Sequence, residues 1–167
     1  YEIPMVLEAE DVGNKLLRDL GIKPRTTKMD AWKKFVKNIG RPKKEVRIAV
    51  VGEYFGTGDF TLADSYHSVI ESVKHAAWIN GVTPKMEWID SEQFERAPRT
   101  VSMFSSYDGI IVPGGFGTRG IEGIIRVIQY AREKKIPYFG LCYGMQLACV
   151  EFARNVLEKA GAHTVEV

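Results

Sequence analysis

The chain has 167 residues, of which 45% are apolar and 26% charged, and its formal net charge is +2. These values are typical of a soluble protein with one domain and an attached segment, and they give no reason to expect nucleic acid or a membrane surface as a partner. The two cysteines, Cys142 and Cys149, exclude a disulfide framework and the usual zinc-ligand spacings, and they fit a reducing, cytoplasmic compartment.

Residues 1–45 are predicted to form a helical connector. The segment EDVGNKLLRDLG (10–21) repeats its apolar residues on one side, and DAWKKFVKNIG (30–40) does so more regularly, with Asp30 as the expected N-cap. The polar, proline-containing stretch RPKKE then predicts a linker and a domain boundary near residue 45. The chain begins without methionine and ends where a new extended segment is expected to start, so we expect it to be part of a longer polypeptide.

Residues 46–167 alternate between strand and helix patterns. Strands are expected at 46–52, 84–90, 107–115 and 136–142, and helices at 63–81, 122–135 and 145–161. This alternation predicts a doubly wound α/β fold with a mainly parallel sheet and helices on both faces. Ligands of such folds bind beyond the carboxyl ends of the strands. The strand ends with glycines are therefore candidate sites: Gly52, Gly114–Gly115 and Gly140–Cys142.

The sequence GLCYG (140–144) has the form G-x-C-x-G between a strand and a helix. This pattern is the cysteine version of the nucleophile elbow, a tight turn that exposes the reactive atom above the sheet edge. The helix N-terminus favours a thiolate, and the N–H of Tyr143 would face a developing oxyanion. The alternative is a buried structural cysteine, which is our interpretation of Cys149, in the apolar stripe of Met145, Cys149, Phe152 and Val156.

The loop VPGGFGTRG (112–120) also follows an expected strand, and it matches the dinucleotide-binding pattern G-x-G-x-x-G. That pattern belongs on the first strand of its unit and needs an acidic residue about 20 positions later, and neither condition is met. The competing interpretation is that Gly115 supplies a second N–H donor beside Cys142. The glycine-rich stretch after Gly52 lacks the residues of a phosphate-binding P-loop and is interpreted as a loop that shapes the cleft.

Three segments together resemble the glutamine amidotransferase domain of the CTP synthase family: GEYFGTGDFTLADSYHSVIESVKHA, VPGGFGTRGIEG and AREKKIPYFGLCYGMQLACVEFARNV. The opening YEIPMVLEAE and the tryptophan helix resemble the end of that family's synthase domain and the connector that follows. The resemblance implies that Cys142 is the nucleophile that attacks glutamine. It also implies that the glutamine pocket and oxyanion hole are formed by Gly115, Tyr143, Gly144, Met145 and Gln146. Glu166 would contact the α-amino group of glutamine.

The resemblance further implies a cytoplasmic ligase of pyrimidine nucleotide biosynthesis that makes CTP from UTP, ATP and glutamine. It implies a homotetramer activated by GTP, with ATP and Mg²⁺ bound in a synthase domain ahead of Tyr1, and no metal or cofactor in this chain.

Two departures from the family pattern affect this prediction. Tyr143 stands where leucine is usual and is closer to the GMP synthetase branch, and the family's C-terminal H-x-E, which completes the triad, is absent. The remaining histidines, His67, His75 and His163, do not match it, so we expect the isolated chain to be a very poor glutaminase. Three alternatives stay open: another class I amidotransferase such as GMP synthetase, a non-catalytic nucleotide-binding module, and a pseudo-enzyme that keeps the fold for protein interaction.

Overall fold

The computed structural model describes residues 1–23, 29–39, 44–52, 66–115 and 117–166. Its elements are, in chain order, α1 (Ile3–Ala9), α2 (Val12–Asp19), α3 (Asp30–Ile39), β1 (Glu45–Gly52), α4 (His67–Ile79), β2 (Thr83–Asp90), α5 (Glu92–Arg96), the 3-10 helix η2 (Pro98–Ser106), β3 (Gly109–Val112), α6 (Ile121–Lys134), β4 (Tyr138–Gly140) and α7 (Tyr143–Asn155).

The sheet has four parallel strands in the order β2-β1-β3-β4. Val50 of β1 lies opposite Trp88 of β2 and Ile111 of β3, and Val112 of β3 lies opposite Gly140 of β4. The chain leaves β1 toward one side for β2 and then returns to the other side for β3, so the strand order reverses between β1 and β3. This topology confirms the expected doubly wound fold and brings the ends of β1, β3 and β4 to one edge.

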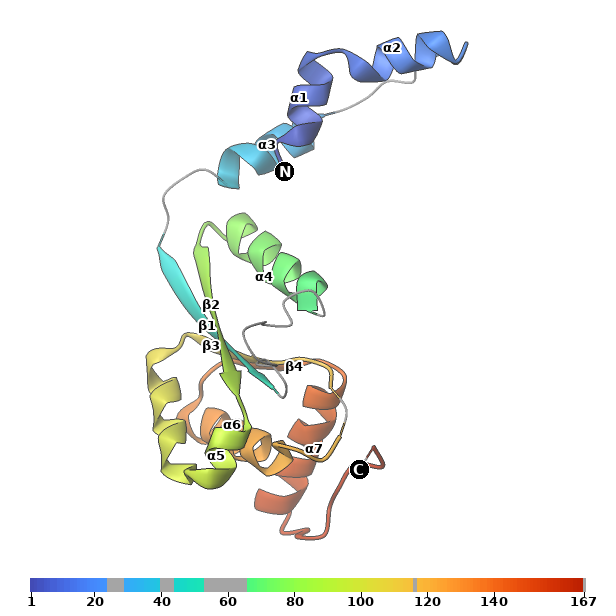
Figure 1. Cartoon of the computed structure of the whole chain (residues 1–167). Coiled ribbons are helices and arrows are strands. Elements are labelled where there is room, and N and C mark those ends of the chain that lie inside the picture. The colour runs from blue at the N-terminus through green and yellow to red at the C-terminus, as the bar shows by residue number, and fades with distance from the viewer. Residues whose placement is uncertain (24–28, 40–43, 53–65, 116, 167) are drawn as a thin grey trace.

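Helices cover both faces of the sheet, as Figure 1 shows, with α4 on one face and α5, α6 and α7 on the other. The side with α6 and α7 holds most of the core. Residues there that are 5% exposed or less include Ile124, Val127 and Ile128 of α6, and Leu147 and Val150 of α7. The parallel strands and this one-sided core place the start of α7 against the end of β3, where Gly144 lies close to Val112.

The connector helices α1, α2 and α3 lie apart from the sheet and meet it through α4 (Figure 1). An aromatic cluster makes this contact: Tyr1 packs against Trp78 with ring centroids 5.2 Å apart, and its hydroxyl lies 2.8 Å from Nε2 of His75. Phe35 of α3 packs edge-on to His75 at 5.4 Å. The connector therefore touches the C-terminal half of α4.

Several sequence predictions need correction. Asp30 is the first residue of α3 rather than its N-cap, because the Lys33 N–H bonds to the carbonyl of Met29. Helix α7 begins at Tyr143 and ends at Asn155, and residues 161–166 contain turns instead of an extended segment. Helices α1, α5 and η2 carry too few periodic apolar residues to be predicted.

The predicted core stripe of α7 is also wrong. Met145 is 56% exposed, Phe152 46% and Val156 42%, and Cys149 is exposed as well. The face of α7 that packs on the sheet instead carries Tyr143, Leu147 and Val150, which are 5% exposed or less. Both stripes have helical spacing, so the sequence pattern alone could not choose between them.

Candidate active site

Cys142 occupies the turn between β4 and α7, as the G-x-C-x-G pattern predicts. It is the N-cap of α7, with φ 51° and ψ −104°, and its carbonyl accepts the first helical hydrogen bond, from Gln146 N at 3.1 Å. A positive φ is uncommon for a residue with a side chain, and such strain often marks a functional position. The side chain is exposed, which excludes the interpretation of Cys142 as a buried structural residue.

The two glycines of the pattern are required by close backbone approach. A Cβ on Gly140 would lie 2.5 to 2.7 Å from backbone atoms of Gly144 and Met145. A Cβ on Gly144 would overlap the Val112 carbonyl oxygen and approach the Val112 Cβ to 2.8 Å. Side chains at these two positions would push α7 away from the sheet and move Cys142 with it.

The loop after β3 lies directly beside Cys142. A Cβ built on Gly114 would be 3.6 Å from the Cβ of Cys142, and one on Gly115 would be 3.7 Å from Cδ1 of Tyr143. The Gly115 N–H makes no hydrogen bond within the described part of the chain. This neighbourhood is the one that a second oxyanion donor requires.

Two tyrosine hydroxyls bind the carbonyls of this loop. Tyr66, which precedes α4, donates to the Gly114 carbonyl at 3.3 Å, and Tyr143 donates to the Gly117 carbonyl at 2.8 Å. The Tyr143 side chain is only 2% exposed. The sequence pattern predicted only a main-chain role for Tyr143 and gave no indication of Tyr66, because no sequence signal marks a hydrogen bond to a distant carbonyl.

Gln146 and Glu166, both predicted to contact glutamine, lie together in the structure. The Gln146 Nε2 donates to Glu166 Oε1 at 3.5 Å, and the Gln146 Oε1 accepts from the Thr164 hydroxyl at 2.5 Å. The Glu166 N–H in turn bonds to Thr164 Oγ1 at 3.2 Å. Thr164, which was not predicted, thus connects the two. Of the other predicted residues, Gly144 is buried against β3 and Met145 points to solvent.

None of the three histidines hydrogen bonds to Cys142 within the described residues. His75 belongs to the aromatic cluster beneath the connector, His163 contacts its neighbour Thr164, and His67 is exposed at the start of α4. Cys142 therefore lies beside the Gly114–Gly115 loop, and none of these histidines is bonded to it in the described part of the chain.

The G-x-G-x-x-G loop has unfavourable surroundings for a dinucleotide. In that motif the pyrophosphate lies at the N-terminus of the following helix, here α6. The carboxylate of Glu95 already accepts a hydrogen bond from the Glu122 N–H there, at 3.1 Å, and Glu92 forms an ion pair with Arg119. Two carboxylates at this helix start disfavour an anionic ligand, so the geometry supports the use of the glycines beside Cys142.

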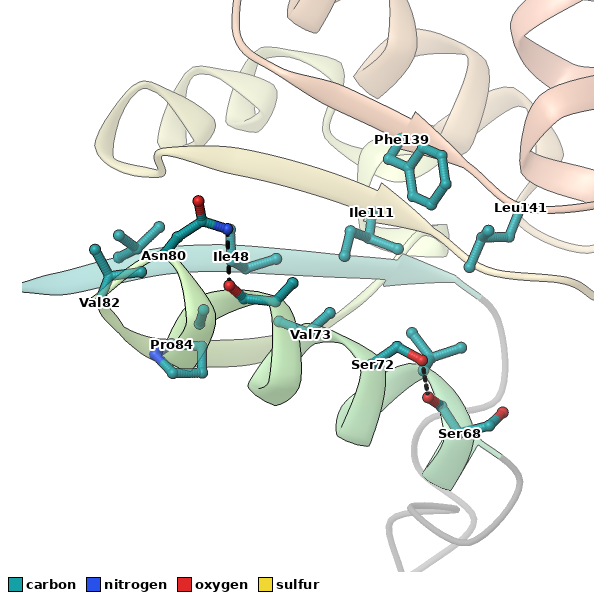
Figure 2. A pocket seen from close by; sticks show the side chains of 14 residues that line it. Ile48, Ser68, Ser72, Val73, Asn80, Val82, Pro84, Ile111, Phe139 and Leu141 are labelled. Atoms are coloured by element: carbon teal, nitrogen blue, oxygen red, sulfur yellow. Dashed lines mark hydrogen bonds between the residues drawn. The ribbon is translucent and has the colours of Figure 1, made fainter. Parts of the chain in front are cut away.

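A separate apolar groove of about 670 Å³ lies between α4 and the sheet, as Figure 2 shows. Its lining residues include Val73 of α4, Ile48 of β1, Ile111 of β3, Phe139 of β4 and Leu141 of the turn after β4. The groove contains neither Cys142 nor a convergent set of charged groups, so it is distinct from the candidate site.

Within the described residues, no three metal-ligating side chains cluster, and no helix has the length and apolar content needed to cross a membrane. The loop after Gly52, which was predicted to shape the cleft, lies outside the described residues.

Comparison with known proteins agrees with this geometry. The family model for "Glutamine amidotransferase class-I" matches residues 61–166. Over the whole chain, the sequence is 46% identical to a CTP synthase of Thermococcus gammatolerans and 44% identical to one of Sulfolobus acidocaldarius. The chain spans only 30% and 31% of those two proteins.

A solved structure, the glutaminase domain of Trypanosoma brucei CTPS with bound acivicin, is also similar. The TM-score is 0.65 at 39% sequence identity, and the match covers 72% of this chain and 45% of the other. The match supports the fold that the strand order and helices describe.

Proposed function

Because the chain belongs to the class I glutamine amidotransferase family, we propose that it forms the glutaminase site of a CTP synthase, with Cys142 as the nucleophile. The supporting observation is the strained, exposed Cys142 at the N-terminus of α7, against the Gly114–Gly115 loop. The similarity to CTP synthases over the whole chain favours this enzyme over GMP synthetase, although Tyr143 departs from the usual residue.

The reaction would proceed through a thioester. The Cys142 thiolate attacks the carboxamide carbon of glutamine, and the N–H groups of Gly115 and Tyr143 stabilise the oxyanion of the tetrahedral intermediate. The C–N bond then breaks, the leaving nitrogen takes a proton, and ammonia departs. Water hydrolyses the thioester to give glutamate and the free thiol. Glu166, held beside Gln146, would bind the α-ammonium group of glutamine.

We propose that the general base comes from outside these 167 residues. A cysteine nucleophile of this kind needs a histidine within hydrogen-bond reach. His75 is engaged with Tyr1 at the far end of α4, and the positions of His67 and His163 do not fit the family's motif.

The rest of the proposal concerns the whole protein. Residues 1–45 would be the end of a synthase domain and its connector, and residues 46–167 the first part of the amidotransferase domain. Ammonia released at Cys142 would be used to convert UTP to CTP. We propose that UTP and ATP with Mg²⁺ bind in the synthase domain, that GTP activates the enzyme, and that it acts as a cytoplasmic homotetramer.

A labelling experiment on the full-length protein tests the nucleophile. The protein is treated with a diazo-ketone analogue of glutamine, with and without excess glutamine, and modified peptides are mapped by mass spectrometry. We expect glutamine-protected labelling of Cys142. Cys149 is the internal control, because it is also exposed and lies in α7, the helix that Cys142 caps.

The analogue should leave Cys149 unmodified, whereas iodoacetamide should alkylate both thiols. Equal modification of the two cysteines by the analogue, or no protection by glutamine, would contradict the assignment. A Cys142→Ala variant should lose glutamine-dependent CTP synthesis and keep synthesis from added ammonia, and Cys149→Ala should keep both.

A further inference from the structure

Tyr66 connects the start of α4 to the loop beside Cys142. Its hydroxyl donates to the Gly114 carbonyl at 3.3 Å, and its ring packs against Trp88 of β2 with centroids 5.6 Å apart and an interplanar angle of 38°. The ring is half-buried and Trp88 belongs to a paired strand, so the hydroxyl is supported by a rigid neighbour.

The bond acts on the peptide group that carries the candidate oxyanion donor. The Gly114 carbonyl and the Gly115 N–H belong to the same planar unit, and in a trans peptide they point in opposite directions. A hydrogen bond that fixes the direction of the carbonyl therefore also fixes the direction of the N–H. Flanking glycines leave this unit unusually free to rotate, because glycine accepts a wide range of φ and ψ.

The same bond also affects the strength of the donor. A carbonyl that accepts a hydrogen bond polarises its amide, so the attached N–H becomes a better donor, and such effects are larger in a partly buried site. Gly114 and Gly115 are both half-buried. The Tyr143 hydroxyl holds the Gly117 carbonyl further along the loop, so tyrosine hydroxyls bind the loop at two places, Gly114 and Gly117.

We propose that Tyr66 is a positioning residue for glutamine hydrolysis, which orients and polarises the Gly114–Gly115 peptide so that its N–H stabilises the oxyanion. The inference rests on the proposed glutaminase function. Tyr66 does not contact glutamine in this proposal, so it stabilises the transition state and does not affect the binding of the substrate.

Removal of the hydroxyl in Tyr66→Phe tests this role in the full-length enzyme. We expect kcat for glutamine hydrolysis to fall about 10-fold to 100-fold, somewhat less than the loss of a whole oxyanion donor, with KM nearly unchanged. CTP synthesis from added ammonia should be unaffected. Tyr107→Phe is the matched control, because the Tyr107 hydroxyl also donates a hydrogen bond, to Glu87 at 2.6 Å. Tyr107 precedes the start of β3, whereas Gly114 follows its end.

A second measurement separates positioning from a general structural effect. An aldehyde analogue of glutamine adds to the Cys142 thiol to give a hemithioacetal, whose oxygen occupies the oxyanion position. Its affinity should fall in Tyr66→Phe by about the same factor as kcat, while alkylation of Cys142 by iodoacetamide, which forms no oxyanion, should keep its rate.

Unchanged kcat and aldehyde affinity in Tyr66→Phe would overturn the inference, as would an equal loss of iodoacetamide reactivity, which would indicate displacement of Cys142. A wild-type enzyme that neither hydrolyses glutamine nor binds the aldehyde would overturn the proposed function and this inference with it.

Discussion

The substitution Gly144→Ala should lower the stability of the domain and displace Cys142, the proposed nucleophile. The added Cβ would overlap the Val112 carbonyl oxygen and lie 2.8 and 2.9 Å from the Val112 Cβ and Cγ1. Carbon atoms in ordinary contact are about 3.5 to 4.0 Å apart, so α7 would have to move away from β3 by about 1 Å. Val112 cannot yield instead, because β3 is paired on both sides.

Two opposing free energies determine the expected stability. Overpacking a dense core costs about 1 to 3 kcal/mol, and contact with a backbone carbonyl belongs at the upper end of this range. Alanine is favoured over glycine in a helix by about 1 kcal/mol, which offsets part of that cost. We therefore expect the free energy of unfolding to fall by about 2 kcal/mol.

The expected effect on catalysis is larger. A shift of about 1 Å in a reacting group can reduce the rate roughly 100-fold, because the attack geometry is lost. The measurements are chemical denaturation and steady-state glutaminase kinetics of the full-length protein. Gly161→Ala is the control, since a Cβ there has no atom within 4 Å and the glycine has no left-handed φ; its stability should change by less than about 0.5 kcal/mol.

A Gly144→Ala variant with native stability and native kcat would refute the argument that close approach of α7 to β3 positions Cys142. Loss of stability with unchanged kcat would separate the two effects and contradict the catalytic part alone.

Two further predictions concern charged groups. Hydrogen bonds from Tyr107 and then Arg47 hold the pKa of Glu87 below its ordinary value of 4.5. The contribution of Glu87 to the free energy of unfolding should therefore be complete above that value and disappear as the pH falls through the lower pKa of the folded state. In denaturation experiments, a Glu87→Gln variant should be less stable than the wild type at neutral pH and equally stable in acid. A loss of stability that does not depend on pH would contradict this. Separately, Glu166→Gln should raise KM for glutamine by roughly 10-fold to 100-fold, because a charge-assisted hydrogen bond to the ammonium group is lost. The change in kcat should be smaller. An unchanged KM would show that Glu166 does not bind the ammonium group.

The local parts of the site could be predicted from sequence because their constraints are local. A cysteine between two glycines, after an apolar strand and before a helix, allows few backbone arrangements, and the structure places Cys142 in the strained turn that this pattern predicts. The parallel sheet followed in the same way from the alternation of strands and helices.

Predictions that depended on long-range packing were less successful. Met145, Cys149 and Phe152 have the spacing of a buried stripe, yet the sheet contacts the neighbouring face of α7. The Tyr66 bond to Gly114 joins residues 48 positions apart through a main-chain acceptor, which any residue could provide. The contacts of Glu92 and Glu95 with the start of α6 could not be predicted, because both residues belong to α5, a helix too short to show a periodic pattern.

The position of α4 has a mechanical consequence. Its C-terminal half touches the connector through His75 and Trp78, and the residue before its first turn, Tyr66, touches the glycine loop. A helix of 13 residues is a stiff rod about 20 Å long. The connector and the glycine loop beside Cys142 therefore contact opposite ends of one stiff helix. A displacement of the connector would reach the hydrogen bond to Gly114 through α4, although the two segments share no direct contact among the interactions described above.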